Sequence, residues 1–185
     1  MTLQDTSFSP QAVVDFWRDA GPQKWFKKDD AFDAQFKARF EAAHEAAASG
    51  SLDAWAATAP GALALLLLLD QFPRNVFRNS PRMYATDAKA LTIARVAVDA
   101  GLDRKIDDPQ LRAFFYLPYM HSESLSDQER CVALCEHAGP DNLRFAKHHR
   151  DIVARFGRFP HRNALLGRPS TPEELQFLQE GGFSG

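Results

Sequence analysis

The stretch GALALLLLLDQFPRN at Gly61–Asn75 decides the fold of this 185-residue chain. Its run Ala62–Leu69 is apolar on every face of a helix, so we expect this helix at the centre of a helical bundle. Eight apolar residues are too few to cross a bilayer. Because Pro73 lacks a backbone N–H and its ring clashes with the preceding turn, the helix is expected to end before it. Asp70 would then lie at the C-terminal end of the most buried helix.

Helix start and stop signals continue along the rest of the chain. Pro, Ser, Thr and Asp stand where helices begin and Gly stands where they end. No segment alternates with period two, so the sequence predicts an all-α fold of about eight helices. The predicted boundaries are Ser9–Gly21, Asp29 or Asp30 to Gly50, Pro60 to Pro73, Ser80 or Thr86 to Gly101, Asp108–Pro118, Ser126–Gly139 (with Ser126 and Glu129 as a capping box), Pro140–Gly157 and Thr171–Gly181 (with Thr171 and Glu174 at its start).

Composition favours an ordinary globular protein. The chain is 45% hydrophobic and 25% charged, and its net charge of −2 points to neither nucleic acid nor a membrane as partner. We expect one domain over residues 1–185, with residues 1–8 and 181–185 frayed. No signal peptide is expected, and the two cysteines, Cys131 and Cys135, are predicted to be reduced and buried on a helix. These features predict a cytoplasmic protein.

Three segments place ionisable groups at an aromatic-proline break after an apolar run. They read DQFPRNVFR at Asp70–Arg78, FYLPYMHSE at Phe115–Glu123 and RFGRFPHRN at Arg155–Asn163. The last lies in Arg144–Arg168, which holds seven Lys/Arg and three His against one acidic residue, Asp151. We expect the three segments to meet at one end of the bundle and build a polar pocket.

Asp70 needs a partner wherever the helix ends. The helix dipole disfavours an anion at a C-terminus, so a cation must compensate, and Arg74 or Arg78 is the nearest candidate. Asp70 is then either part of a structural salt bridge or the floor of a pocket. A further contact from Arg158 or Arg162, to Asp70 or to Glu123, would join the segments across the bundle. Arg168 has no predicted partner, and we expect its removal to have little effect.

Several other polar residues allow two interpretations each. His121 and Glu123 could form an acid/base pair or half of a metal site, but their spacing fits no zinc signature. His149 falls on the apolar stripe of its helix, where it is either a hydrogen-bonded core residue or part of a site. Asp127 and Gln128 are either caps or the lip of a cavity. No GxGxxG, GxxxxGK[ST] or GxSxG motif supports nucleotide binding or serine hydrolysis.

Four motifs in order carry a resemblance to a known family. They are QFPRN at Gln71–Asn75, HSE at His121–Glu123, DQER at Asp127–Arg130 and HRDIVARFGRFPHRN at His149–Asn163. Together they resemble the bacterial family called domain of unknown function 924, from about Val13 to Leu178, although Ser124 stands where an acidic residue is expected. The resemblance implies a tetratricopeptide-like array of antiparallel helical hairpins in a cytoplasmic bacterial protein. It implies no activity.

The first functional hypothesis is a module that binds an anionic small molecule or an acidic peptide. The alternative is a metal-free enzyme that acts on a small anion, with His as acid or base and Arg as anchor. RNA binding through the basic C-terminal segment is a third possibility. No cofactor or metal is predicted. The candidate catalytic residues are His121, Glu123 and His161, and the candidate ligand-binding residues are Asp70, Arg74, Asp127, His149, Arg155, Arg158, Arg162 and Asn163.

Overall fold

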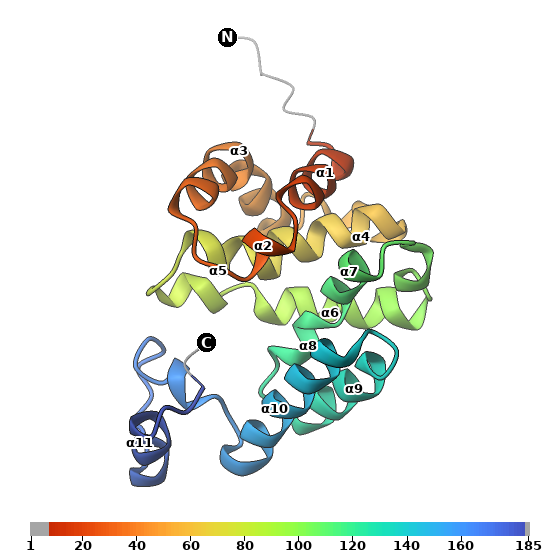
Figure 1. The fold of residues 1–185 in the computed structure, drawn as a ribbon. Helices are drawn as coiled ribbons and strands as arrows, with labels where there is room; N and C mark the ends of the chain where they lie inside the picture. The colour runs from red at the N-terminus through yellow and green to blue at the C-terminus, as the bar shows by residue number, and fades with distance from the viewer. Residues whose placement is uncertain (1–7, 184–185) are drawn as a thin grey trace.

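The computed structural model describes residues 8–183, and every regular element in that range is helical (Figure 1). The all-α prediction is therefore confirmed. The α-helices are α1 (Pro10–Ala20), α2 (Pro22–Trp25), α3 (Asp30–Ser49), α4 (Ala59–Leu66), α5 (Phe72–Val76), α6 (Asp87–Asp99), α7 (Pro109–Arg112), α8 (Leu117–Met120), α9 (Leu125–Cys135), α10 (Pro140–Phe156) and α11 (Pro172–Gln179). Shorter turns are η1 (Asp53–Ala57), η2 (Leu67–Gln71), η3 (Pro81–Tyr84), η4 (Asp103–Lys105), η5 (Ala113–Phe115) and η6 (Pro160–Arg162). No helix in the described range is long and apolar enough to span a bilayer.

The ends of the described chain are packed. Phe8 lies against the main core, and Phe183 lies against a smaller apolar cluster around Ile152, Val153 and Phe159. These two residues of the predicted frayed ends therefore have apolar contacts in the structure, and the prediction itself stays a prediction. For residues 1–7 and 184–185 it falls outside the described range.

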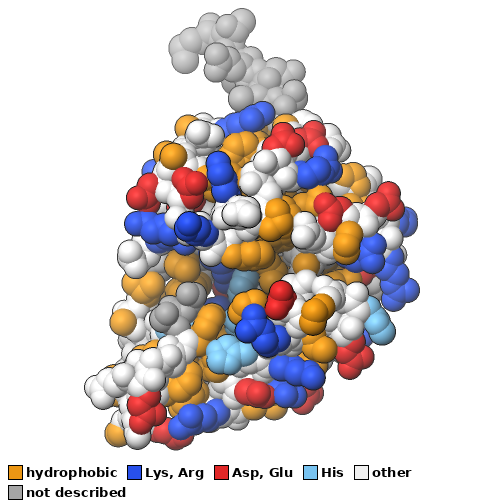
Figure 2. All heavy atoms as spheres, in the orientation of Figure 1, with side chains coloured by type: hydrophobic (Ala, Val, Ile, Leu, Met, Phe, Trp, Pro, Cys, Tyr) orange, Lys and Arg blue, Asp and Glu red, His pale blue; other side chains and the backbone are white. Residues whose placement is uncertain are grey.

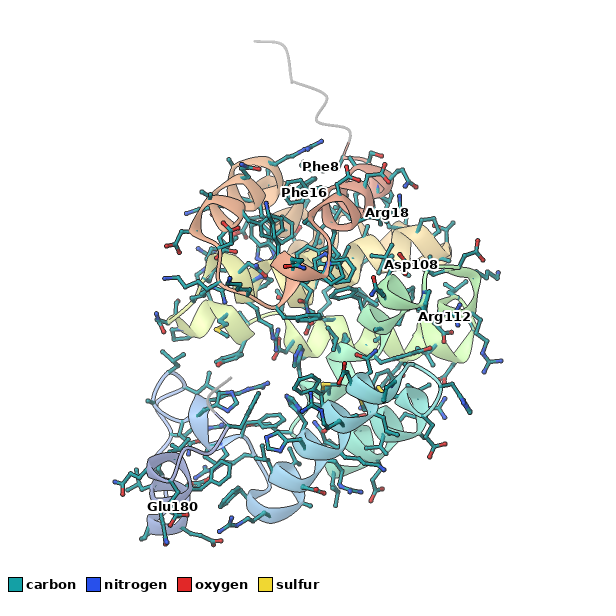
Figure 3. All side chains as sticks on the ribbon, in the orientation of Figure 1. Phe8, Phe16, Arg18, Asp108, Arg112 and Glu180 are labelled. Carbon is teal, nitrogen blue, oxygen red and sulfur yellow. The ribbon has the colours of Figure 1, made fainter. Side chains whose placement is uncertain are left out.

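Helix α4 lies at the centre of the main core, as its sequence predicts. Its leucines are fully buried, and it packs against α1 and α6 while α3 packs against the turn η2 and α5. The aromatic stripe Phe32, Phe36 and Phe40 of α3 faces this core. Phe32 and Phe36 stack with Phe16 of α1, and Phe40 meets the same ring edge to face. In Figure 3 the labelled Phe8 and Phe16 lie in this α1–α3 part of the molecule.

The leucine helix does not end before Pro73, contrary to the prediction. Residues 67–71 form a π-helical turn that joins α4 to α5 without a break. In this wider turn the N–H of Phe72 bonds to the carbonyl of Leu67, five residues back. Pro73 then falls in the first turn after the π segment, where its missing N–H is tolerated. Asp70 consequently lies inside a continuous helix rather than at its end.

Two carbonyl groups lose their helical partners at this turn, and side chains replace those partners. The carbonyl of Leu68 accepts from Nδ1 of His44 at 2.9 Å, because the N–H of Phe72 bonds elsewhere. The carbonyl of Leu69 accepts from the hydroxyl of Thr86, since Pro73 offers no N–H. A buried carbonyl without a partner costs about 1–3 kcal/mol, so these two contacts stabilise the π turn.

The C-terminal part begins with α9 and α10, which pack against each other below the main core in Figure 1. Cys131 and Cys135 are free and buried on α9, as predicted. The predicted capping box of this helix is wrong: α9 begins at Leu125 after Ser124, and Ser126 bonds to the Ser124 hydroxyl instead. The predicted start of α11 at Thr171 and Glu174 is confirmed, and these two residues form a capping box.

Candidate functional site

The site is built around Asp70, whose side chain is 2% exposed. One carboxylate oxygen, Oδ1, accepts from Nδ1 of His121 at 2.7 Å and lies 3.1 Å from Nη1 of Arg74. The other, Oδ2, accepts from Nε2 of Gln71 at 2.6 Å. The predicted salt bridge with Arg74 is confirmed. The contact with His121 brings the first two aromatic-proline segments together.

Asp87, at the start of α6, extends this network to the third segment. Arg74 donates to both of its carboxylate oxygens, at 2.8 and 2.9 Å. Nη1 of Arg162 lies 3.5 Å from Oδ2 of Asp87. We call Asp70, Arg74, Asp87, His121 and Arg162 the charged cluster. The sequence anticipated an arginine of the third segment here, but with Asp70 or Glu123 as its partner rather than Asp87.

Burial and neighbouring charges fix the ionisation of the charged cluster. Burial alone would raise the pKa of Asp70, but Arg74 and His121 hold it well below its usual range. For Arg74, burial opposes the charge, yet Asp70 and Asp87 raise its pKa above the ordinary value. Burial and the cation of Arg74 lower the pKa of His121 despite the adjacent Asp70. At neutral pH Asp70 is therefore ionised, Arg74 carries its positive charge and the imidazole of His121 is neutral.

Arg162 has unused hydrogen-bonding capacity. Its side chain is 8% exposed, and its guanidinium carbon lies 4.6 Å from the ring centres of both Tyr84 and Phe159. Its Nε is buried and has no partner, and none of its N–H groups donates a hydrogen bond to a residue in 8–183. Burial is the main cause that lowers the pKa of Arg162, and the positive charge of Arg74 is the second cause. A guanidinium has five N–H donors, so this one is poised to take an acceptor from outside the described chain.

Two further histidines adjoin Arg162. Nδ1 of His149 donates to the carbonyl of Phe145 at 2.8 Å, whereas Nδ1 of His161 is buried without a partner. The ring of Phe183 lies 4.6 Å from that of His149 and 5.1 Å from that of His161. Burial is the largest cause of the fall in the pKa of each histidine to about 4, and the charge of Arg162 contributes to both. The ring of Phe159 lies 5.7 Å from each of the two imidazole rings and 4.6 Å from the guanidinium carbon of Arg162, so these groups surround one region.

That region is partly open. The face drawn in Figure 2 is hollowed near its middle, where histidine and charged side chains colour the hollow. Figure 3 shows side chains reaching into the same space from the helices above and from the C-terminal segment below. Among the larger residues of the charged cluster, His121 is 16% and Arg74 is 13% exposed. His121 and Arg74 therefore keep some contact with solvent.

Glu123 lies beside the charged cluster and joins the second segment to the third. It accepts the backbone N–H of Phe159 at 2.8 Å and takes a bidentate contact from Arg168, at 2.6 and 2.9 Å. Arg168 also donates to the side chain of Asn163 at 3.0 Å. The three aromatic-proline segments therefore converge as predicted. The sequence assigned Arg168 no partner, and the structure corrects this.

We now expect Arg168→Ala to lower the free energy of unfolding by about 2–3 kcal/mol, because it leaves the half-buried Glu123 carboxylate without its cation. Arg155→Ala is the matched control, since Arg155 pairs with Glu173 where both side chains are more than half exposed. Urea unfolding of the two variants provides the comparison. Equal stability of the two would contradict a supporting role for Arg168.

The other candidate residues have partners outside the charged cluster. Asp127 accepts from Arg95 at 2.6 Å and from Ser122 at 2.7 Å, while Gln128 caps α8 by donating to the carbonyls of Met120 and Ser122. Arg155 pairs with Glu173, and Arg158 makes a bidentate contact with Glu174, to which Asn163 also donates. These residues hold the C-terminal segment in place. Of the predicted set, the structure brings together Asp70, Arg74, His121, His149, His161 and Arg162, with Glu123 adjoining.

Sequence reasoning missed Asp87, Tyr84 and Phe183. Asp87 is the first residue of α6, where an acidic side chain is favoured by the helix dipole. Its position therefore gives no indication that it pairs with Arg74, 13 positions earlier. Tyr84 and Phe183 stand in turns with no periodicity. The one available signal was the surplus of aromatic residues near the arginines.

Comparison with known proteins agrees with this architecture. Residues 13–182 match the family described as bacterial protein of unknown function (DUF924). A solved structure of a protein of unknown function from Agrobacterium tumefaciens is 52% identical to this chain, with a TM-score of 0.90 over 93% of this chain and 97% of that one. No curated protein matches at a significant level. The chain belongs to the DUF924 family of bacterial proteins of unknown function.

Proposed function

We propose that this protein binds a small anionic molecule at Arg162. The observation that carries the proposal is the guanidinium of Arg162, buried between two aromatic rings and without a hydrogen-bond acceptor in the described chain. Every other arginine of the third segment and its surroundings donates to a carboxylate of this chain. A guanidinium in this state favours a bidentate contact with carboxylate or phosphate.

Charge and burial favour a small monoanion over a larger or more highly charged ligand. Two arginines of the charged cluster already face two aspartates, so a dianion would bring excess negative charge beside Asp70 and Asp87. The guanidinium is recessed, so only a group of a few atoms reaches it. The rings of Tyr84 and Phe159 exclude water and strengthen the contact with an anion. We infer a small carboxylic acid rather than an acidic peptide.

Thermal unfolding with and without anions tests this proposal. We expect acetate, benzoate, pyruvate or 2-oxobutyrate to raise the melting temperature by about 3–6 °C at ten times its dissociation constant. Arg162→Gln should abolish the rise, whereas the control Arg155→Gln should keep it, because Arg155 is exposed and paired with Glu173. Inorganic phosphate and an Asp/Glu-rich peptide serve as competing ligands. If no anion stabilises the wild-type protein at millimolar concentration, or if Arg162→Gln responds equally, Arg162 is not an anion site.

We also propose that the helices form a tetratricopeptide-like array and that the protein works in the cytoplasm. The packing of α8, α9 and α10 against one another supports the first statement. The free, buried thiols of Cys131 and Cys135, whose sulfur atoms lie 4.0 Å apart, support a reducing compartment.

A further inference from the structure

We propose that Asp70 and His121 act as a general-base pair, which removes a proton from the carbon next to the oxo group of a small 2-oxo acid whose carboxylate is held by Arg162. This inference rests on the proposed function, because Arg162 must first place the acid. It adds an activity and names a catalytic residue, His121, with Asp70 as its positioning residue.

The hydrogen bond between the two residues fixes the state of the imidazole. An ionised carboxylate only accepts hydrogen bonds, so Nδ1 of His121 carries the proton that it shares with Oδ1 of Asp70. The lone pair of the neutral ring is then on Nε2. No residue within 8–183 bonds to this Nε2, and it is not among the buried unpartnered atoms, so it keeps some contact with solvent. A carboxylate that orients an imidazole in this way is the standard arrangement for a histidine base.

The surroundings keep this base unprotonated at neutral pH. Asp70 and Arg74 face His121 from the leucine helix, Asp87 faces it from α6, and His149 and His161 contribute from α10 and η6. Tyr84 and Glu123 complete the titratable groups around the charged cluster. Burial is the largest influence on the pKa of His121 and, with Arg74, it outweighs the opposing effect of Asp70 and Asp87, so the neutral ring is favoured.

The groups that the structure brings together suit removal of a proton from the substrate itself. Ser122 donates its hydroxyl to Asp127, and the thiols of Cys131 and Cys135 are buried against each other, so none of these nucleophiles is available to His121. What remains is a base, a cation and two aromatic rings. A base and a cation are sufficient to form and hold an enolate.

The step balances without a cofactor. The C–H bond next to the carbonyl breaks, and its proton moves to Nε2 of His121. The electron pair of that bond forms an enolate, whose oxygen faces one of the guanidinium groups of the charged cluster. The imidazolium then exchanges its Nε2 proton with solvent and returns a solvent hydrogen to the same carbon. The net reaction is exchange of the hydrogen on that carbon with solvent.

Proton NMR in D₂O with pyruvate and 2-oxobutyrate tests the inference directly. We expect the wild-type protein to replace the hydrogens next to the oxo group faster than a protein-free blank. His121→Gln should slow this exchange by about 10²-fold or more while the acid still raises the melting temperature. Asp70→Asn should also slow it, because an amide no longer selects the Nδ1–H tautomer as strongly. The wild-type rate should fall as acid protonates His121.

Each failure has a separate meaning. If pyruvate and 2-oxobutyrate stabilise the protein but do not exchange, His121 is not a base and anion binding at Arg162 stands. If other carboxylates bind and these two do not, the inference also fails while the proposed function stands. If no anion binds, both are overturned. Equal exchange by wild type and His121→Gln would assign the proton transfer to another group and overturn the role of His121.

Discussion

Asp70→Ala should lower the free energy of unfolding by about 3–5 kcal/mol. The carboxylate is buried and accepts from Gln71 and His121 while it pairs with Arg74. Its removal leaves two buried donors without acceptors and gives Arg74 only Asp87 as a counterion. A loss of this size is a large share of the stability of a typical domain. Urea unfolding followed by circular dichroism measures it.

Two further variants separate structure from function at this position. Asp99→Ala removes an exposed aspartate that pairs with Arg130 at 3.5 Å, and it should cost less than about 1 kcal/mol. Asp70→Asn keeps the shape but not the charge. If Asp70 serves a ligand rather than the fold, Asp70→Asn will keep wild-type stability and lose the response to anions. A wild-type unfolding curve for Asp70→Ala would rule out the structural role.

Acid should destabilise the protein well before its carboxylates titrate. His149 and His161 have a pKa of about 4 in the folded state, against about 6.5 in an unfolded chain. Between these values the unfolded chain binds more protons, so the free energy of unfolding falls as the pH falls from about 6.5 toward 4. Together the two residues should cost about 2–4 kcal/mol between pH 7 and pH 5. Urea unfolding at four pH values over this range measures the loss.

The matched variant for this experiment is His161→Gln. This variant removes one group whose pKa is lowered in the folded state. The slope of the free energy of unfolding against pH, between pH 7 and pH 5, should therefore decrease by the equivalent of up to one bound proton. A wild-type free energy of unfolding that is constant down to pH 5 would show that the two imidazoles titrate normally.

Local patterns predicted much of this fold. The apolar run Ala62–Leu69 identified the central helix, because a segment without a polar face has no stable place at a surface. Proline and glycine marked most helix ends correctly, since both act through the backbone of their own turn. The prediction that the helix ends before Pro73 was wrong because it, too, considered only the local effect of proline on its own turn. Only Thr86 and His44, distant in sequence, make a continuous helix possible there.

The candidate site was predictable in its residues but not in its pairings. Charged groups beside aromatic-proline breaks indicated that three segments would meet, and contacts of His121 and Glu123 join them. Which arginine stays without an acceptor depends on long-range partners. Arg168 takes Glu123, and Arg158 takes Glu174, so Arg162 is left with one long ion pair. No spacing in the sequence distinguishes these three arginines.

The π turn at residues 67–71 gives the leucine helix two phases. Each residue of an α-helix advances by about 100°, and the extra residue in a π turn rotates everything after it by that amount relative to everything before it. The α4 part can therefore bury leucines all round while the π turn presents Asp70 toward His121 and α5 presents Arg74 toward Asp87. The number of residues from Ala59 to Val76 is therefore as important for the fold as their types. A one-residue insertion or deletion would rotate the buried leucines relative to the charged cluster, so the two could no longer both face their partners.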